Sequence, residues 1–190
     1  MIKKLLQKIF KKISYFFFSI IYGKIDSSIK SNEDKIIQAL QDDLHKPKME
    51  AYFSEIVFCY KEIDHAIKHL EDWMAPTTVG TPLALQPGKS QIYNDARGSV
   101  LIIAPWNYPF QLTISPLIAA IAGGNAAVLK PSEMAKNIQA LLVEMINNEF
   151  EEELIHCIGG AVTESQMLLK LPFDFIFFTS TSWCNYDVTY

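Results

Sequence analysis

The stretch Val100–Glu133 reads VLIIAPWNYPFQLTISPLIAAIAGGNAAVLKPSE and decides the fold. Within it, two short apolar runs, Val100–Ala104 and Ala126–Leu129, flank a helical stretch over Leu112–Ala122. A short, unbroken apolar run of this kind is typical of a strand that is covered on both faces. The order strand, helix, strand therefore predicts two neighbouring parallel strands joined by a crossover helix.

The alternation continues after this stretch. Pro131-Ser132-Glu133 is expected to open a helix whose buried face carries Ile138, Leu141, Leu142 and Met145. The remaining expected elements are a strand over Leu154–Ile158, a short helix with Thr163 and Gln166 as its capping box, and a strand over Phe175–Phe178. Four strands alternating with three helices predict an α/β fold with a parallel sheet, whose ligands bind at the carboxyl ends of the strands.

The sequence before the stretch divides into two parts. Residues 32–86 contain helical apolar stripes from Ile36 to Leu44 and from Ile56 to Met74, followed by an extended connector over Thr77–Pro87. We place a boundary near Gln86, so that residues 87–180 form the sheet domain. Residues 181–190 are a separate tail.

Residues 1–31 have a different character. Five lysines lie in the first twelve residues, Lys3, Lys4, Lys8, Lys11 and Lys12, and the first acid of the chain is Asp26. They lead into the apolar run Ile13–Tyr22, which has the outline of a signal peptide. This run is shorter than the ~20 residues that a spanning helix needs, and no small-residue cleavage site follows it. We therefore favour a surface helix or a poorly ordered extension over a membrane anchor, which lipid-vesicle flotation would test.

The overall composition is that of a globular protein. The chain of 190 residues is 49% hydrophobic and 20% charged, with a formal net charge of -4. The sequence contains no basic stripe interleaved with aromatic residues, so it does not predict a nucleic-acid partner. The three cysteines are far apart and lack metal-ligand spacing, which argues against disulfides and zinc and favours a reducing cytoplasm.

Asn107 follows the first strand, between Pro105 and Pro109. An Asn held just past a strand end can donate its side-chain NH2 to an oxyanion that forms during a reaction. The residues alone favour a simpler interpretation, an Asx turn in a proline-rich loop.

Lys130 and Glu133 follow the second strand. A lysine and a carboxylate there can bind the two hydroxyls of a ribose, although Glu133 equally suits a helix dipole and Lys130 a solvated strand end. Gly159-Gly160 follows the third strand and would let the backbone approach a ligand or simply make a turn. The usual dinucleotide pattern GxGxxG is absent from the sequence.

These residues together resemble the aldehyde dehydrogenase superfamily, most closely its class 3 and fatty aldehyde dehydrogenase branch. The resemblance is carried by PWNYP at 105–109 and LKPSE at 129–133. Supporting matches are NEDKIIQA at 32–39, LHKP at 44–47 with EAY at 50–52, TPLALQP at 81–87 and FDFIFFT at 173–179. It spans roughly residues 32–180 and implies an incomplete Rossmann-like sheet preceded by helices.

The resemblance also implies roles for single residues. Asn107 matches the family's catalytic Asn, which helps to bind the oxyanion. Trp106 and the backbone before it match the wall of the nicotinamide side, and Lys130 with Glu133 matches the pair that holds the adenosine ribose. The residues expected to bind NAD or NADP are Ile103, Ala104, Pro105, Trp106, Lys130, Pro131, Ser132, Glu133, Gly160, Thr179 and Ser180.

The chain departs from the family pattern near its end. The glycine expected after Thr179 is replaced by Ser180, and the tail beyond it does not match. None of Cys59, Cys157 and Cys184 matches the family nucleophile, and the general-base Glu of the family is also missing. We therefore expect no aldehyde oxidation by this chain alone. The alternative is a non-catalytic pseudogene product, or a partner that docks on an intact aldehyde dehydrogenase. The resemblance implies that the intact enzyme is a homodimer.

Overall fold

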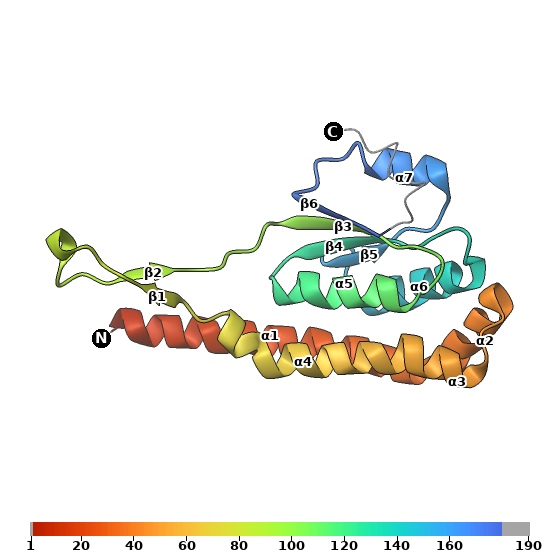
Figure 1. Cartoon of the computed structure of the whole chain (residues 1–190), viewed down its shortest axis with the longest axis horizontal. Coiled ribbons are helices and arrows are strands. Elements are labelled where there is room, and N and C mark those ends of the chain that lie inside the picture. The colour runs from red at the N-terminus through yellow and green to blue at the C-terminus, as the bar shows by residue number, and fades with distance from the viewer. Residues whose placement is uncertain (1, 180–190) are drawn as a thin grey trace.

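The computed structural model describes the backbone of residues 2–179 and the surroundings of side chains from residue 15 onward. Its centre is a parallel sheet in the order β5-β4-β3-β6 (Figure 1). The strands are β3 (Ser99–Ile103), β4 (Ala126–Lys130), β5 (Ile155–Cys157) and β6 (Phe175–Phe178). The predicted α/β fold with a parallel sheet is confirmed. The predicted tail, residues 181–190, and Ser180 lie outside the described residues.

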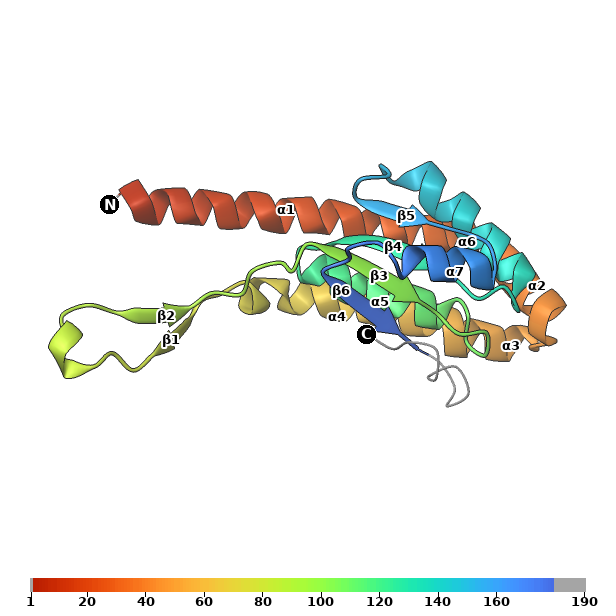
Figure 2. The ribbon, with the colours of Figure 1, turned by 90° about the horizontal axis from the view of Figure 1, so that it is seen from above.

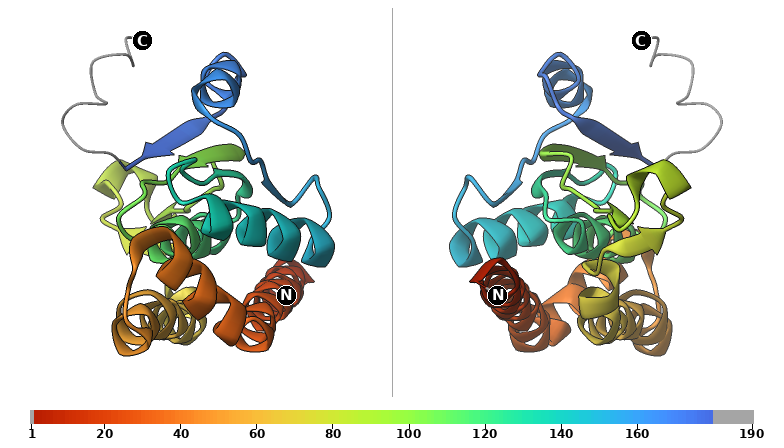
Figure 3. Two further views of the ribbon diagram at one scale, coloured as in Figure 1. Left: turned by 90° about the vertical axis from the view of Figure 1, so that its right-hand side faces the viewer. Right: turned by 90° about the vertical axis from the view of Figure 1, so that its left-hand side faces the viewer.

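Helices cover both faces of this sheet. α5 (Gln111–Ala122) and α6 (Lys136–Glu149) lie on one face, and α7 (Val162–Leu168) lies on the other (Figure 3). Successive side chains of a strand point to opposite faces. Accordingly, Val100 and Ile102 belong to the main core, whereas Leu101 and Ile103 pack with Leu168 of α7 in a smaller cluster.

A further layer of helices packs beneath α5 and α6. It consists of α1 (Ile2–Ser31), α2 (Glu33–Leu44), α3 (Lys48–Ala51), the π-helical turn η1 (Tyr52–Ile56) and α4 (Val57–Trp73) (Figure 1). The apolar stripe predicted for the long helix is present, because Ile56, Ile63 and Leu70 are buried. No helix in the described part of the chain is long and apolar enough to cross a membrane.

The second half of α1 is part of the core. Ile21, Tyr22, Ile25 and Ile29 are at most 3% exposed, and the Tyr22 hydroxyl donates to the Ile118 carbonyl at 2.9 Å. The boundary that we placed after residue 31 therefore cuts through one packed unit. In the sequence, the lysines and phenylalanines before this stripe obscure its helical spacing.

The connector forms an arm that projects from the body (Figure 2). β1 (Thr77–Val79) pairs antiparallel with β2 (Ser90–Ile92), and the 3-10 turn η2 (Leu83–Leu85) lies between them. The boundary placed at Gln86 therefore falls inside a hairpin.

Two predicted helix starts are wrong. α6 begins at Lys136, so Glu133 lies in the preceding turn. Asp43 of α2 provides the reason, since its carboxylate accepts from the amides of Asn137 at 3.1 Å and Ile138 at 2.9 Å. α7 begins at Val162, and the Glu164 carboxylate accepts from the Ala161 amide at 2.7 Å in place of the expected Thr163–Gln166 box.

Candidate functional site

The predicted site residues meet at the carboxyl edge of the sheet. The parallel register pairs Ile103 with both Lys130 and Phe178, so β3, β4 and β6 end at one level. The Ala104 amide donates to the Lys130 carbonyl at 3.1 Å, and the Thr179 amide donates to the Ile103 carbonyl at 3.1 Å. The loops that contain Asn107, Glu133 and Thr179 therefore leave the same edge, as the strand pattern predicts.

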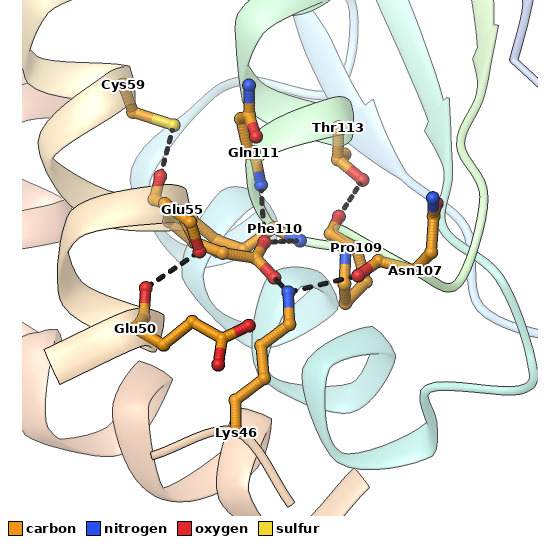
Figure 4. Close-up of polar contacts among 10 residues, drawn as sticks. Lys46, Glu50, Glu55, Cys59, Asn107, Pro109, Phe110, Gln111 and Thr113 are labelled. Carbon is orange, nitrogen blue, oxygen red and sulfur yellow. Dashed lines mark hydrogen bonds and ion pairs between the residues drawn. The ribbon is translucent and has the colours of Figure 1, made fainter. Parts of the chain in front are cut away.

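Asn107 lies in the loop between β3 and α5. Its side chain is exposed and makes no hydrogen bond with the described residues, whereas its backbone carbonyl is firmly held. Figure 4 shows the side chain pointing away from the buried polar groups behind the loop. Trp106 beside it is 42% exposed. An amide presented in this way can donate to a ligand atom without first breaking an internal bond.

A buried ion pair between Lys46 and Glu55 lies behind this loop (Figure 4). The Lys46 ammonium donates to the Asn107 carbonyl at 3.0 Å and lies 3.9 Å from the centre of the Tyr108 ring. The second carboxylate oxygen of Glu55 accepts from the Phe110 and Gln111 amides, each at 3.0 Å. Two residues of the N-terminal helical layer thus hold both ends of the Asn107 loop.

The π-helical turn η1 contains Glu55. Lys48–Trp73 forms an uninterrupted helix in which Tyr52–Ile56 takes the wider π turn. Such turns shift the register of a helix and frequently lie at functional sites. Burial raises the pKa of Glu55, and the hydrogen bond from Lys46 and the two amides oppose this effect.

Lys130 and Glu133 form the second part of the site. The Lys130 side chain is 1% exposed and its ammonium donates to the Pro131 carbonyl at 2.9 Å. It lies 3.8 Å from the Glu133 carboxylate, which is 40% exposed. Burial lowers the pKa of Lys130, and Glu133 opposes this effect. The exposed carboxylate therefore faces solvent with a buried cation behind it.

Gly160 lies at the same edge of the sheet, in the turn that follows β5. Its φ of +120° is unfavourable for other residues, and an added Cβ would lie 2.5 Å from Glu164. Gln139 of α6 joins this turn to the one after β4, since its side-chain NH2 donates to the carbonyls of Pro131 at 3.0 Å and Gly160 at 2.9 Å. The Gln139 side chain therefore fixes the distance between the turns that contain Pro131 and Gly160.

Other predicted residues contribute less. The Ser132 hydroxyl accepts from the Met134 amide at 3.2 Å, and the Thr179 side chain is half-buried. Ser180 and Cys184 lie outside the described residues. Cys157 is 1% exposed, and burial raises its pKa to about 12. Burial also raises the pKa of Cys59. Both thiols are packed in the core, as predicted for Cys157, and neither is an activated nucleophile.

Sequence reasoning missed Lys46, Glu55 and Gln139. Lys46 lies in one of the matching blocks, but nothing in the spacing links it to a loop 61 residues away. Glu55 could have been noticed as a carboxylate one position before Ile56 at the start of a buried stripe. Gln139 neighbours Ile138 on α6 and has no signal of its own.

A groove of about 380 Å³ lies elsewhere, between α4 and the C-terminal end of α5. It is lined in part by His65, Trp73, Asn94 and Gly123. Gly123 precedes β4, so this groove lies toward the amino ends of the strands. Ligands of parallel sheets bind at the opposite edge. We therefore place the candidate site at the loops of the carboxyl edge.

The carboxyl edge presents several groups of the kinds that dinucleotide sites use. Glu133 offers an exposed carboxylate acceptor for ribose hydroxyls, and Gly160 provides a turn without a side chain. The exposed Trp106 offers an apolar wall, and the Asn107 amide offers a donor. These groups lie on loops whose backbones are tied to one another, so little ordering is needed when a ligand binds.

Comparisons with known proteins agree with this fold. Residues 18–184 match the family model described as the aldehyde dehydrogenase family. A Staphylococcus aureus 4,4'-diaponeurosporen-aldehyde dehydrogenase is 48% identical over 83% of this chain and 34% of its own length. Aldehyde dehydrogenase family 3 member H1 of Arabidopsis thaliana is 41% identical over 80% of this chain and 31% of its own.

A solved structure, the substrate-bound state of Staphylococcus aureus AldH, is also similar. It superposes with a TM-score of 0.80 at 43% identity, over 92% of this chain and 40% of that one. A helical layer packed against a parallel sheet that is covered by helices on both faces defines an α/β protein. The chain belongs to the aldehyde dehydrogenase family.

The match is wider than the sequence analysis predicted. It begins at residue 18 instead of 32 and ends at 184 instead of 180. It therefore includes the buried stripe of α1. The chain spans about a third of the length of the curated relatives given above.

Proposed function

We propose that this chain forms the NAD(P)-binding part of an aldehyde dehydrogenase. The observation that carries the proposal is the meeting of the Asn107 loop and the Lys130–Glu133 turn at one edge of the sheet. Glu133 accepts from the ribose hydroxyls of the adenosine, and Lys130, 3.8 Å away, holds that carboxylate in place. Trp106 and Ile103–Pro105 form the wall on the nicotinamide side. The cofactor, when bound, supplies the hydride acceptor.

Asn107 is proposed to donate its side-chain NH2 to the oxygen of the aldehyde as negative charge develops there. Its free amide and fixed backbone support this role, because a donor that is already oriented lowers the cost of stabilising the charge. Cys59 and Cys157 are buried in the core, and neither is proposed to act as the nucleophile. The chain alone is therefore proposed to bind a dinucleotide without oxidising aldehydes.

Two measurements test this function. Isothermal titration calorimetry with NAD+ and with NADP+ should show saturable binding of at least one of them at a single site. Mixing the chain with NAD+ and a panel of aldehydes should give no aldehyde-dependent NADH absorbance. Failure to bind either dinucleotide at millimolar concentration would refute the binding role, and steady NADH formation would refute the inactivity.

A second candidate is a non-catalytic partner of an intact aldehyde dehydrogenase. The edge strand β6 favours it, because Phe175, Phe177 and Phe178 are 37–43% exposed. Exposed apolar edge strands pair readily with other chains. Light scattering after size exclusion of the chain mixed with an intact aldehyde dehydrogenase distinguishes the two candidates: separate elution of the two proteins would argue against the partner role.

A further inference from the structure

We propose that Lys46 and Glu55 are positioning residues for Asn107. Their ion pair fixes the backbone of the Asn107 loop, and this fixes the direction in which the Asn107 side chain leaves the protein. The functional meaning of that direction rests on the proposed function. The hydrogen bonds of the pair to the Asn107 carbonyl and to the Phe110 and Gln111 amides fix the loop whatever its function.

Lys46 holds the front of the loop. Its ammonium has three donors, and it uses them on the Glu55 carboxylate and on the Asn107 carbonyl. The same ammonium lies 3.9 Å from the centre of the Tyr108 ring, a cation–π contact. Because a peptide group is planar, a bond to the Asn107 carbonyl fixes the peptide between Asn107 and Tyr108 as a whole.

Glu55 holds the back of the loop. Its carboxylate accepts from the Phe110 and Gln111 amides, which belong to the unpaired donors at the start of α5. Phe110 is fully buried, and the Thr113 hydroxyl donates to the Pro109 carbonyl at 2.6 Å. The segment between Asn107 and Gln111 is therefore held at each end by one member of the pair.

The location of the ion pair indicates that it orients the Asn107 loop and that its contribution to the stability of the fold is secondary. A buried ion pair contributes little net stability compared with apolar side chains of similar volume. Here the pair reaches a loop whose central side chain, Asn107, is exposed and makes no bond with the described residues. The wider turn at Tyr52–Ile56 contains Glu55, where it meets the start of α5.

The test replaces the pair by apolar side chains of similar length, in Lys46→Met/Glu55→Met. No buried charge is left without a partner, so the double variant should fold. The matched control is Lys35→Met/Glu144→Met, which removes an exposed ion pair with a 3.9 Å contact. Hydrogen exchange of single amides is then followed by NMR in both variants and in the parent.

We expect the Phe110 and Gln111 amides to exchange about tenfold faster in the double variant, because each has lost its acceptor. Amides of β3 and β4, such as Ile102 and Leu129, should exchange as in the parent, and the control should change none of them. Uniform acceleration of all amides would show a purely structural pair and overturn the proposal, as would unchanged loop amides.

Two further variants keep the test decisive. Lys46→Arg retains the charge and the donors and should preserve loop protection. Glu55→Gln keeps the shape of the side chain and one acceptor oxygen. It should lower the exchange protection of the Phe110 and Gln111 amides more than that of the strand amides. This variant gives a result even if the double variant does not fold. Calorimetry adds a functional comparison: because the same loop contains Trp106, the proposed wall on the nicotinamide side, the double variant should bind NAD+ severalfold more weakly than the parent and AMP equally well. A parent that binds neither nucleotide would count against the proposed function, and the exchange result would still decide the role of the pair.

Discussion

The two halves of the candidate site are built in different ways. The Lys130–Glu133 turn is local, since its ion pair joins residues three positions apart and its lysine donates to the next carbonyl in the chain. The Asn107 loop depends on Lys46, which lies 61 positions from the Asn107 that it contacts, and on Glu55, which lies 55 positions from Phe110. The local half can be read from a short stretch of sequence, whereas the other half exists only once the helical layer has packed.

The largest expected effect comes from Lys46→Met. It leaves the Glu55 carboxylate buried without its cation, which costs about 3–5 kcal/mol in the free energy of unfolding. Urea unfolding of the variant and the parent at neutral pH measures the difference. A loss below about 1 kcal/mol would show that the pair is solvated in solution.

The pH dependence of this loss has a definite sign. Burial already raises the pKa of Glu55, and removal of Lys46 takes away an opposing effect. A carboxyl group whose pKa is higher in the folded state stabilises the fold below its ordinary pKa and loses that contribution as the pH rises. The deficit of Lys46→Met should therefore shrink at acidic pH and grow toward neutral pH. A constant deficit in urea titrations across this range would contradict the buried-carboxylate explanation.

Gly160→Ala is the next strongest change, and it affects the local half. The φ of +120° and the 2.5 Å approach of an added Cβ to Glu164 should cost about 1–3 kcal/mol. Thermal unfolding measures it. Gly23→Ala is the matched control, because an added Cβ there has nothing within 4 Å. A melting temperature of Gly160→Ala equal to that of the parent would show that the turn relaxes without cost.

Glu133→Gln tests the ligand role of the local half without a large change in stability. Loss of a charged acceptor for ribose hydroxyls should weaken NAD+ binding by about tenfold. NADP+ should lose less, because its additional phosphate is repelled by the carboxylate. Calorimetric titration of both cofactors gives the ratio. An unchanged affinity for NAD+ would place the ribose elsewhere.

Asn107→Ala should have the smallest effect on folding. The side chain is exposed and unbonded within the described residues, so the free energy of unfolding should change by no more than about 0.5 kcal/mol. Urea unfolding tests this. A larger loss would mean that the amide has a structural role, in line with the Asx turn that the residues alone favour.

The sequence predicted the parts of the fold that depend on neighbouring residues. Continuous apolar runs such as Val100–Ala104 located the strands, and the alternation with helices gave the parallel sheet. The edge at which Asn107 and Lys130 meet followed from that topology. The predicted start of α6 failed because its cap comes from a distant residue, Asp43 of α2.

The missing members of the site share that cause. The positions of these members, Lys46, Glu55 and Gln139, depend on packing between layers. The spacing of apolar residues in the sequence does not predict which helix contacts which loop. The N-terminal boundary failed for a related reason, because Tyr22 becomes recognisable as a core residue only once it lies against α5.

The most direct test of the central claim is an NMR titration of the chain with NAD+. The account predicts that amide shifts change at the carboxyl edge, in the non-proline residues of 104–107, 130–133 and 159–160. It predicts none in the groove lined by His65 and Asn94. Saturable changes confined to that groove, or spread evenly over the surface, would contradict a dinucleotide site at this edge.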